Sequence, residues 1–156
     1  MKQHMTGLSE FLTFRIDVFN DQAKQLATEV YEEAHGVSLR ELRVLRLAYA
    51  TPGITQGEVV AASRLEKTLV SKLITSLARR QLLVREIGAQ DARWVHIHLT
   101  DEGRHIVRQC NRLGRKMERS LLSVLSESDR ALFDRCLDRL TAQVERDALD
   151  ARRFMT

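Results

Sequence analysis

The sequence predicts a mainly α-helical fold with one small β-hairpin, and three observations support this prediction. The chain has 156 residues but only 1 proline and 7 glycines, so few residues interrupt helices. In most segments the apolar residues recur at steps of three and four, which is the spacing of an amphipathic helix. In residues 94–99 the pattern has a period of two instead, with Val95, Ile97 and Leu99 on one face and Trp94, His96 and His98 on the other, as in a half-buried strand.

The N-terminal third predicts two helices. Residues 8–34 have helical apolar spacing throughout and predict one long helix, which Gly36 ends because glycine suits the left-handed cap position. Ser38 and Glu41 form a capping-box pattern that begins a second helix. This helix ends at the strongest break in the chain, residues 51–53, which contains the sole proline.

The middle of the chain predicts two closely joined helices followed by a hairpin. A second capping box, Thr55 with Glu58, begins a short helix, and a turn near residues 63–65 separates it from the next one. The expected elements are a helix over 66–81, a strand over 82–87, a turn over 88–91 and a strand over 94–99. Together with the preceding helix this order is that of a winged helix-turn-helix.

Two long helices follow, and their apolar stripes predict a homodimer. Thr100 caps the first of them and Ser126 caps the last. We expect the apolar residues of these helices, which recur at a period close to 3.5 residues, to face inward. Nothing in the middle of so small a chain is available to cover the apolar stripes of the terminal helices, so we expect these stripes to pack against a second copy. These residues are Ile106, Cys110, Leu113, Met117 and Leu121, and then Leu132, Phe133, Leu137, Leu140 and Val144.

The expected organisation has three parts with different charges. Residues 1–36 form an N-terminal dimerisation helix with a net charge of −3, and residues 37–100 form a winged helix-turn-helix domain with a net charge of +5. Residues 101–156 form C-terminal dimerisation helices, in which 101–119 carry +3 and 120–150 carry −3. A basic centre between acidic ends is the distribution expected when the centre faces a polyanion.

The helix over 66–81 has an outer face suited to double-stranded DNA. Small hydroxyl side chains allow close approach to base edges, and Lys and Arg reach guanine acceptors or phosphates. A solvated face of an ordinary amphipathic helix is the alternative, and the helix-turn-helix context favours DNA. The predicted contact residues are Lys67, Thr68, Ser71, Lys72, Thr75 and Arg79.

The hairpin tip supplies two further candidate DNA contacts. Arg93 stands where a wing enters the minor groove, and Asp91, two residues before it, is placed to orient the guanidinium. An ordinary polar turn with a surface ion pair is the alternative interpretation.

These segments resemble the MarR (multiple antibiotic resistance regulator) family of transcription factors. The resemblance rests on Ser38–Leu45, Thr55–Glu58, Glu66–Leu73, Leu77–Arg85, the Asp91-Ala-Arg93 wing and Leu99-Thr-Asp-Glu-Gly103. The sequence departs from the family at Gln81, where the family usually has glycine. The resemblance implies a homodimer joined by helices from both ends, recognition by the 67–75 face, Arg93 in the minor groove, and a pseudo-palindromic operator.

The resemblance also implies a small effector, an aromatic carboxylate or a phenol, bound between the dimer helices and the DNA-binding part. We expect it to release the DNA, as in a repressor. Such a site needs an apolar slot with a buried cation, although each candidate arginine has the alternative of an ordinary salt bridge. The candidate residues are Phe11, Arg15, Phe19, Tyr31, His35 and Arg46.

Other functions have weaker support in the sequence. A redox switch at Cys110 or Cys136 is one alternative, although both cysteines fall on or near apolar stripes. A winged helix that binds a protein partner is another. The sequence lacks phosphate-loop, nucleophile-elbow and zinc-protease motifs, so no enzyme is expected. No cofactor, metal site or membrane segment is expected either, and the two cysteines suit a cytoplasmic protein that is associated with the nucleoid when bound to DNA.

Overall fold

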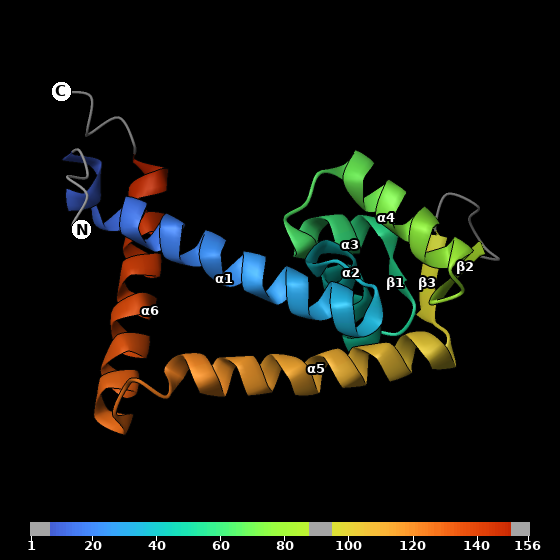
Figure 1. Cartoon of the computed structure of the whole chain (residues 1–156). Helices are drawn as coiled ribbons and strands as arrows, with labels where there is room; N and C mark the ends of the chain where they lie inside the picture. The colour runs from blue at the N-terminus through green and yellow to red at the C-terminus, as the bar shows by residue number, and fades with distance from the viewer. Residues whose placement is uncertain (1–6, 88–94, 151–156) are drawn as a thin grey trace. The chain divides into compact units, whose positions relative to one another are not determined.

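The computed structural model describes residues 7–87 and 95–150 (Figure 1). It divides into two compact units, Met1–Gly114 and Arg115–Thr156, and α5 runs across the boundary between them. The expected division into two dimerisation parts and one DNA-binding part stays a proposal. The elements are η1 (Gly7–Glu10), α1 (Leu12–His35), α2 (Leu39–Ala50), β1 (Ile54–Thr55), α3 (Gln56–Ser63), α4 (Lys67–Arg79), β2 (Leu83–Ile87), β3 (Val95–Leu99), α5 (Asp101–Leu122) and α6 (Glu127–Leu149).

The N-terminal helix is interrupted near its start, which corrects the prediction of one helix over 8–34. Phe11 has an extended backbone and separates the short 3-10 turn η1 from α1. The apolar spacing continues through this residue, so periodicity alone gave no sign of the break. At its other end α1 stops as expected, because Gly36 adopts the left-handed conformation at φ 62° and its N–H donates to the Glu32 carbonyl.

Both capping boxes are confirmed. The Ser38 N–H donates to Glu41 Oε2 at 2.9 Å, and the Glu41 N–H donates to Ser38 Oγ at 3.3 Å. Thr55 and Glu58 repeat this arrangement at 2.8 and 3.3 Å. The backbone N–H and then the hydroxyl of Thr55 lower the pKa of the Glu58 carboxyl, so this carboxylate stays charged at the start of α3.

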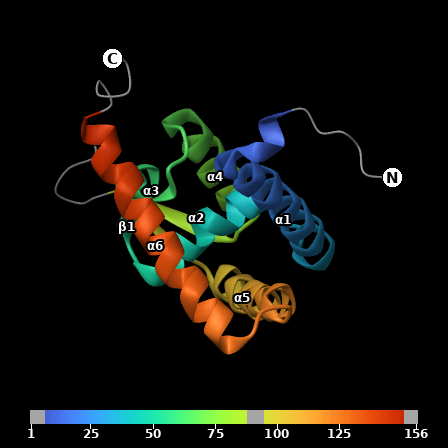
Figure 2. The same cartoon turned by 90° about the vertical axis from the view of Figure 1, so that its left-hand side faces the viewer.

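The core of the first unit forms around α2. Figures 1 and 2 place α2 between α4 on one side and α5 on the other. Leucine, valine and isoleucine side chains fill the space between these helices and the sheet, as the low aromatic content predicts. The largest fully buried residues include Leu42, Leu45, Val59, Val70, Ile74, Leu77, Leu83, Ile97 and Val107.

The predicted pairing of the two hairpin strands is confirmed, and a third strand joins them. The predicted turn over 88–91 lies outside the described residues. β2 pairs with β3 in antiparallel register, with Leu83 opposite Leu99 and Ile87 opposite Val95. β1 pairs with the other edge of β3, so the sheet order is β1-β3-β2. The sequence analysis missed β1 because a strand of 2 residues is too short to show an alternating pattern.

The end of α4 holds a non-glycine residue in a conformation that glycine prefers. Gln81 has φ 58°, and its N–H donates to the Ala78 carbonyl while the Leu82 N–H donates to the Leu77 carbonyl. These two bonds form a Schellman motif, the common helix ending with a left-handed residue. The departure at Gln81 therefore leaves the turn geometry intact.

The apolar stripes of α1 and α6 are exposed in the single chain. Phe11 at the N-cap of α1, and Leu12, Phe19 and Leu26 on the helix itself, are each more than half exposed. On α6 no residue is buried, which corrects the expectation that its apolar residues face inward within the chain. These residues (Leu132, Phe133, Leu137, Leu140 and Val144) have exposed fractions between 45% and 67%.

Candidate nucleic-acid interface

A helix-turn-helix formed by α3 and α4 carries the candidate interface. The turn between the two helices begins at Arg64, which adopts the left-handed conformation with φ 55°. The Leu65 N–H donates to Ser63 Oγ at 3.2 Å, and Arg43 of α2 donates to the Ser63 carbonyl at 3.1 Å. The turn is therefore fixed both by its own side chain and by α2.

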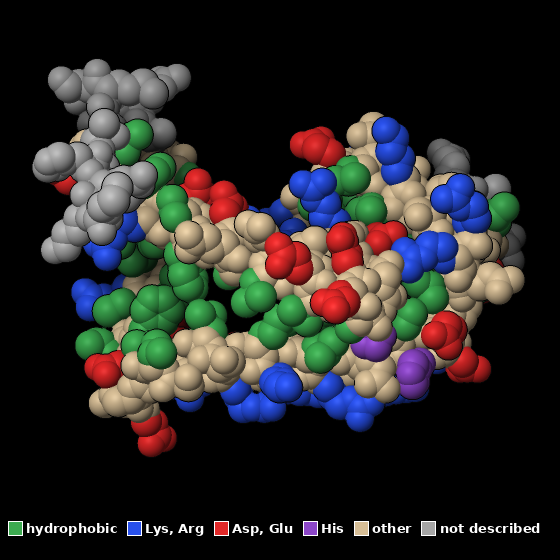
Figure 3. All heavy atoms as spheres, in the orientation of Figure 1, with side chains coloured by type: hydrophobic (Ala, Val, Ile, Leu, Met, Phe, Trp, Pro, Cys, Tyr) green, Lys and Arg blue, Asp and Glu red, His purple; other side chains and the backbone are tan. Residues whose placement is uncertain are grey.

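The outer face of α4 is exposed along its whole length. Val70, Ile74 and Leu77 are buried on the inner side, which fixes the rotation of the helix about its axis. All of the predicted contact residues on α4 are exposed: Lys67, Thr68, Ser71, Lys72, Thr75 and Arg79. No acidic residue occurs between positions 67 and 79, and Figure 3 shows blue Lys and Arg side chains over this helix. This face is therefore positive and lined with small hydroxyl groups.

The wing is described only at its base. Asp91 and Arg93 lie outside the described residues, so their predicted contacts stay predictions. His96 and His98 lie on the same face of β3. His96 Nδ1 lies 2.9 Å from the Gly53 carbonyl, and His98 Nε2 lies 3.4 Å from a Glu86 carboxylate oxygen. Both histidines are half-buried because they contact neighbouring strands and the loop before β1.

A second polar cluster joins α1, α2 and α5. The Arg46 guanidinium donates to Asn111 Oδ1 at 2.8 Å and to the Tyr31 hydroxyl at 3.3 Å, and it lies 5.7 Å from the centre of the Tyr31 ring. Among the described residues no carboxylate pairs with Arg46, so this half-buried cation has only neutral partners. A Cβ at Gly114 would lie 2.7 Å from the Tyr31 hydroxyl, so glycine leaves room for this cluster.

The predicted effector residues fall into two groups. Tyr31 and Arg46 are in contact, and His35 lies one turn beyond Tyr31 on α1 and is half-buried. Phe11 is the N-cap of α1, and Arg15 and Phe19 lie on the N-terminal half of this helix; all three are exposed. Because a helix rises about 1.5 Å per residue, Arg15 stands roughly 24 Å along the axis from Tyr31. Sequence analysis missed Asn111, whose only signal was a polar residue beside the apolar stripe of α5.

The remaining candidates contribute little chemistry. Cys110 is fully buried, and this burial raises the pKa of its thiol even though the Arg46 charge opposes the shift. A protonated, enclosed thiol reacts slowly, which argues against the redox alternative at this position. Cys136 is exposed on α6.

Within the described residues no metal-binding cluster of His, Cys, Asp and Glu occurs, and no helix there is long and apolar enough to cross a membrane.

The fold and the exposed basic face define a winged helix-turn-helix protein. Residues 35–93 match the model of the MarR family. Over these residues the resemblance to the MarR family, on which the sequence analysis rested, is confirmed. No curated protein matches the chain.

Solved structures share this fold. The chain resembles MepR of Staphylococcus aureus, a transcription regulator of the multidrug efflux pump MepA, in its DNA complex: 26% identity, TM-score 0.77, coverage 86% of this chain and 98% of that chain. PcaV of Streptomyces coelicolor, solved with its natural ligand, has 20% identity, a TM-score of 0.73, and coverage of 90% and 98%. A MarR/EmrR family regulator from Acinetobacter has 17% identity, a TM-score of 0.78, and coverage of 90% and 99%.

Proposed function

We propose that this protein is a DNA-binding transcriptional regulator that reads a pseudo-palindromic operator as a homodimer. The observation that carries the proposal is the outer face of α4, which is exposed, free of acidic residues and presented by a fixed helix-turn-helix. Hydroxyl groups on this face suit base edges, and Lys67, Lys72 and Arg79 suit phosphates or guanine. The likeness to the MepR–DNA complex supports the same assignment.

Two copies are required because one α4 covers only a half-site. Half-sites of a symmetric operator lie about one helical turn apart, so two recognition helices must be held at a matching distance. The exposed apolar faces of α1 and of α6 are each suited to contact a second copy. Arg93 at the tip of each wing enters the flanking minor groove and adds to the basic contact.

The DNA proposal is tested with duplexes that the wild-type protein selects from a random pool. Lys72→Ala weakens binding to a selected duplex by about 3- to 30-fold, because one phosphate contact is lost. For the same reason it lowers the salt slope, which is the steepness with which the logarithm of the binding constant falls against the logarithm of the salt concentration, by about one unit. Arg93→Ala also weakens binding and leaves the dimer intact. Lys24→Ala, a lysine on α1 paired with Asp21, is the matched control and binds as wild type.

The competing class is a winged helix that binds a protein partner. Such an adaptor shows almost no salt-dependent affinity for random duplex DNA, whereas a DNA-binding regulator shows a steep slope. Wild-type affinity in both Lys72→Ala and Arg93→Ala would contradict the regulator proposal. Gel shift and fluorescence anisotropy at several salt concentrations measure the affinity for duplex DNA and its dependence on salt.

The effector is a small aromatic carboxylate or phenol that releases the DNA, so the protein acts as a repressor. The supporting observation is Arg46, a half-buried cation that has neutral partners and lies beside the Tyr31 ring. A carboxylate gains most from a cation that no carboxylate already neutralises. Binding there acts on α1, α2 and α5 together and favours a dimer with the wrong spacing of its α4 helices.

Two arginine variants separate the two groups of predicted effector residues. A thermal-shift screen of aromatic acids on wild type identifies a ligand, and calorimetry then compares Arg46→Gln with Arg15→Gln. Arg46→Gln weakens binding by roughly 10-fold or more, as expected for a lost charge-assisted hydrogen bond, and Arg15→Gln binds as wild type. A loss confined to Arg15→Gln places the site on the Phe11–Phe19 half of α1 and contradicts the assignment to Arg46.

A further inference from the structure

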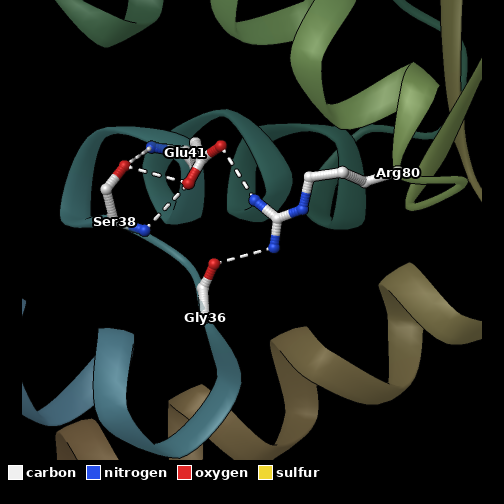
Figure 4. A network of polar contacts seen from close by, with 4 residues as sticks. All are labelled: Gly36, Ser38, Glu41 and Arg80. Atoms are coloured by element: carbon white, nitrogen blue, oxygen red, sulfur yellow. Dashed lines mark hydrogen bonds and ion pairs between the residues drawn. The ribbon is translucent and has the colours of Figure 1, made fainter.

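Arg80 connects the end of α4 to the turn between α1 and α2. Figure 4 shows its guanidinium reaching from the end of α4 toward Gly36 and Glu41. One terminal nitrogen donates to Glu41 Oε1 at 3.0 Å, and the other donates to the Gly36 carbonyl at 2.7 Å. The planar fork of an arginine suits such a two-point contact, because its donors have a fixed separation.

Both partners of Arg80 belong to the ends of helices. Gly36 is the C-cap of α1, whose last carbonyls have no partner within the helix. Glu41 uses Oε2 for the capping box with Ser38 and leaves Oε1 for Arg80. One side chain from the end of α4 therefore holds the carbonyl of the α1 C-cap and the first turn of α2. The Glu41 side chain is only 12% exposed and that of Arg80 34%, so the pair is partly shielded from water.

Arg80 stands apart from the outer face of α4. At about 100° per residue, Lys67 to Arg79 on the outer face span an arc of roughly 140°, and Arg80 falls about 80° beyond its edge. Its neighbour Arg79 lies on the outer face and has no partner among the described residues. The two adjacent arginines therefore have different surroundings, which makes Arg79 a matched reference.

We propose that Arg80 is a positioning residue for DNA binding, which fixes the recognition helix α4 to the end of α1. The inference rests on the proposed DNA-binding function. Arg80 precedes Gln81 and the first residue of β2, so the contact anchors the point where α4 turns into the wing. A displacement of α1, the helix expected to meet the second copy, reaches α4 through this contact.

The experiment compares four variants on the same selected duplex. Arg80→Ala weakens binding by roughly 2- to 30-fold, the range for residues that couple two elements, while the salt slope stays that of wild type. Arg79→Ala lowers the slope by about one unit, as expected for a phosphate contact. Glu41→Gln keeps a capping-box residue but loses the ion pair, so it also weakens binding. The double variant Arg80→Ala/Glu41→Gln loses less than the product of the two single losses, because both remove the same contact.

Amide hydrogen exchange tests the contact without DNA. Arg80→Ala speeds exchange in residues 36–41 and in residues 77–83, whereas Arg79→Ala leaves both segments as in wild type. Unchanged exchange in Arg80→Ala overturns the inference. A lower salt slope in Arg80→Ala, together with wild-type binding by Glu41→Gln, also overturns it and makes Arg80 a direct phosphate contact. If the wild-type protein binds no duplex DNA, the proposed function fails, and the exchange data alone decide whether Arg80 joins α4 to α1.

Discussion

At the scale of single residues, Gln81 occupies a conformation that costs free energy. A left-handed backbone places the Cβ of an L-residue too close to the following carbonyl, at a cost of about 1–2 kcal/mol, which glycine avoids. The Schellman motif keeps Gln81 at φ 58° despite this cost, because two backbone hydrogen bonds and the burial of Leu82 depend on this left-handed conformation. The Gln81 carbonyl also accepts a 2.7 Å bond from the Thr100 hydroxyl, which a glycine keeps.

We predict that Gln81→Gly raises the free energy of unfolding by about 0.5–1 kcal/mol, because the relief of strain exceeds the entropy that glycine adds to the unfolded chain. Thermal unfolding at a fixed protein concentration measures this as a rise of roughly 1–4 °C in Tm. Gln22→Gly, in the helical part of α1, is the matched control and lowers Tm. A lower Tm for Gln81→Gly would show that the left-handed turn carries no strain.

At the scale of the elements, the start of α5 depends on one close backbone contact. The Thr100 hydroxyl accepts from the Gly103 N–H at 3.0 Å and so caps the helix, while the Thr100 N–H donates to the Leu82 carbonyl. A Cβ at Gly103 would lie 1.9 Å from that same carbonyl oxygen. The glycine therefore allows α5 to begin directly against the segment that joins α4 to β2.

Gly103→Ala is expected to destabilise the protein by about 1–3 kcal/mol or more, because a backbone carbonyl must move to admit the methyl group. Gly57→Ala supplies the control. Gly57 lies in α3 with nothing within 4 Å of its Cβ position, so this change stabilises by about 0.5–1 kcal/mol. Chemical denaturation measures the free energy of unfolding of both variants. Equal effects of the two substitutions would contradict the proposed close contact.

The sequence predicted those elements whose signals are local. The capping boxes at Ser38 and Thr55 and the alternation in residues 94–99 each reside in a few neighbouring residues. The structure confirms both capping boxes, and it confirms the strand over its described residues, 95–99. The exposed face of α4 was predictable for the same reason, since helical periodicity alone decides which side is apolar. The break at Phe11 and the strand β1 gave no local signal, because the first continues the apolar spacing and the second is set by its pairing with β3.

Contacts between distant parts of the chain were beyond sequence reasoning. Arg46 and Asn111 are 65 residues apart, and Arg80 and Glu41 are 39 apart. No spacing rule relates such positions, so the sequence offered Arg46 and Tyr31 only as polar residues near apolar ones. It also grouped Arg15 with them, although the length of α1 separates Arg15 from Arg46 in the single chain.

At the scale of the whole molecule, the apolar residues that the single chain leaves exposed point to a second copy. Phe133, Leu137, Leu140 and Val144 follow one another at steps of four, three and four, which places them within roughly 60° on one side of α6. All four are between 45% and 67% exposed. A stripe of this kind with heptad spacing is typical of helices that pack against another helix.

We therefore predict that Leu137→Asp converts a dimer into a monomer. Burial of a leucine contributes about 1.5–3 kcal/mol, so its loss alone weakens the dimer by at least roughly 10-fold, and a carboxylate in an apolar interface adds its desolvation cost. Sedimentation equilibrium over a range of concentrations measures the dissociation constant, and circular dichroism checks that the helices persist. Arg135→Asp places the same carboxylate about 160° away on α6 and leaves the dimer unchanged. If Leu137→Asp dimerises as tightly as Arg135→Asp, the α6 stripe is not the interface, and the exposed apolar face of α1 must supply the contact instead.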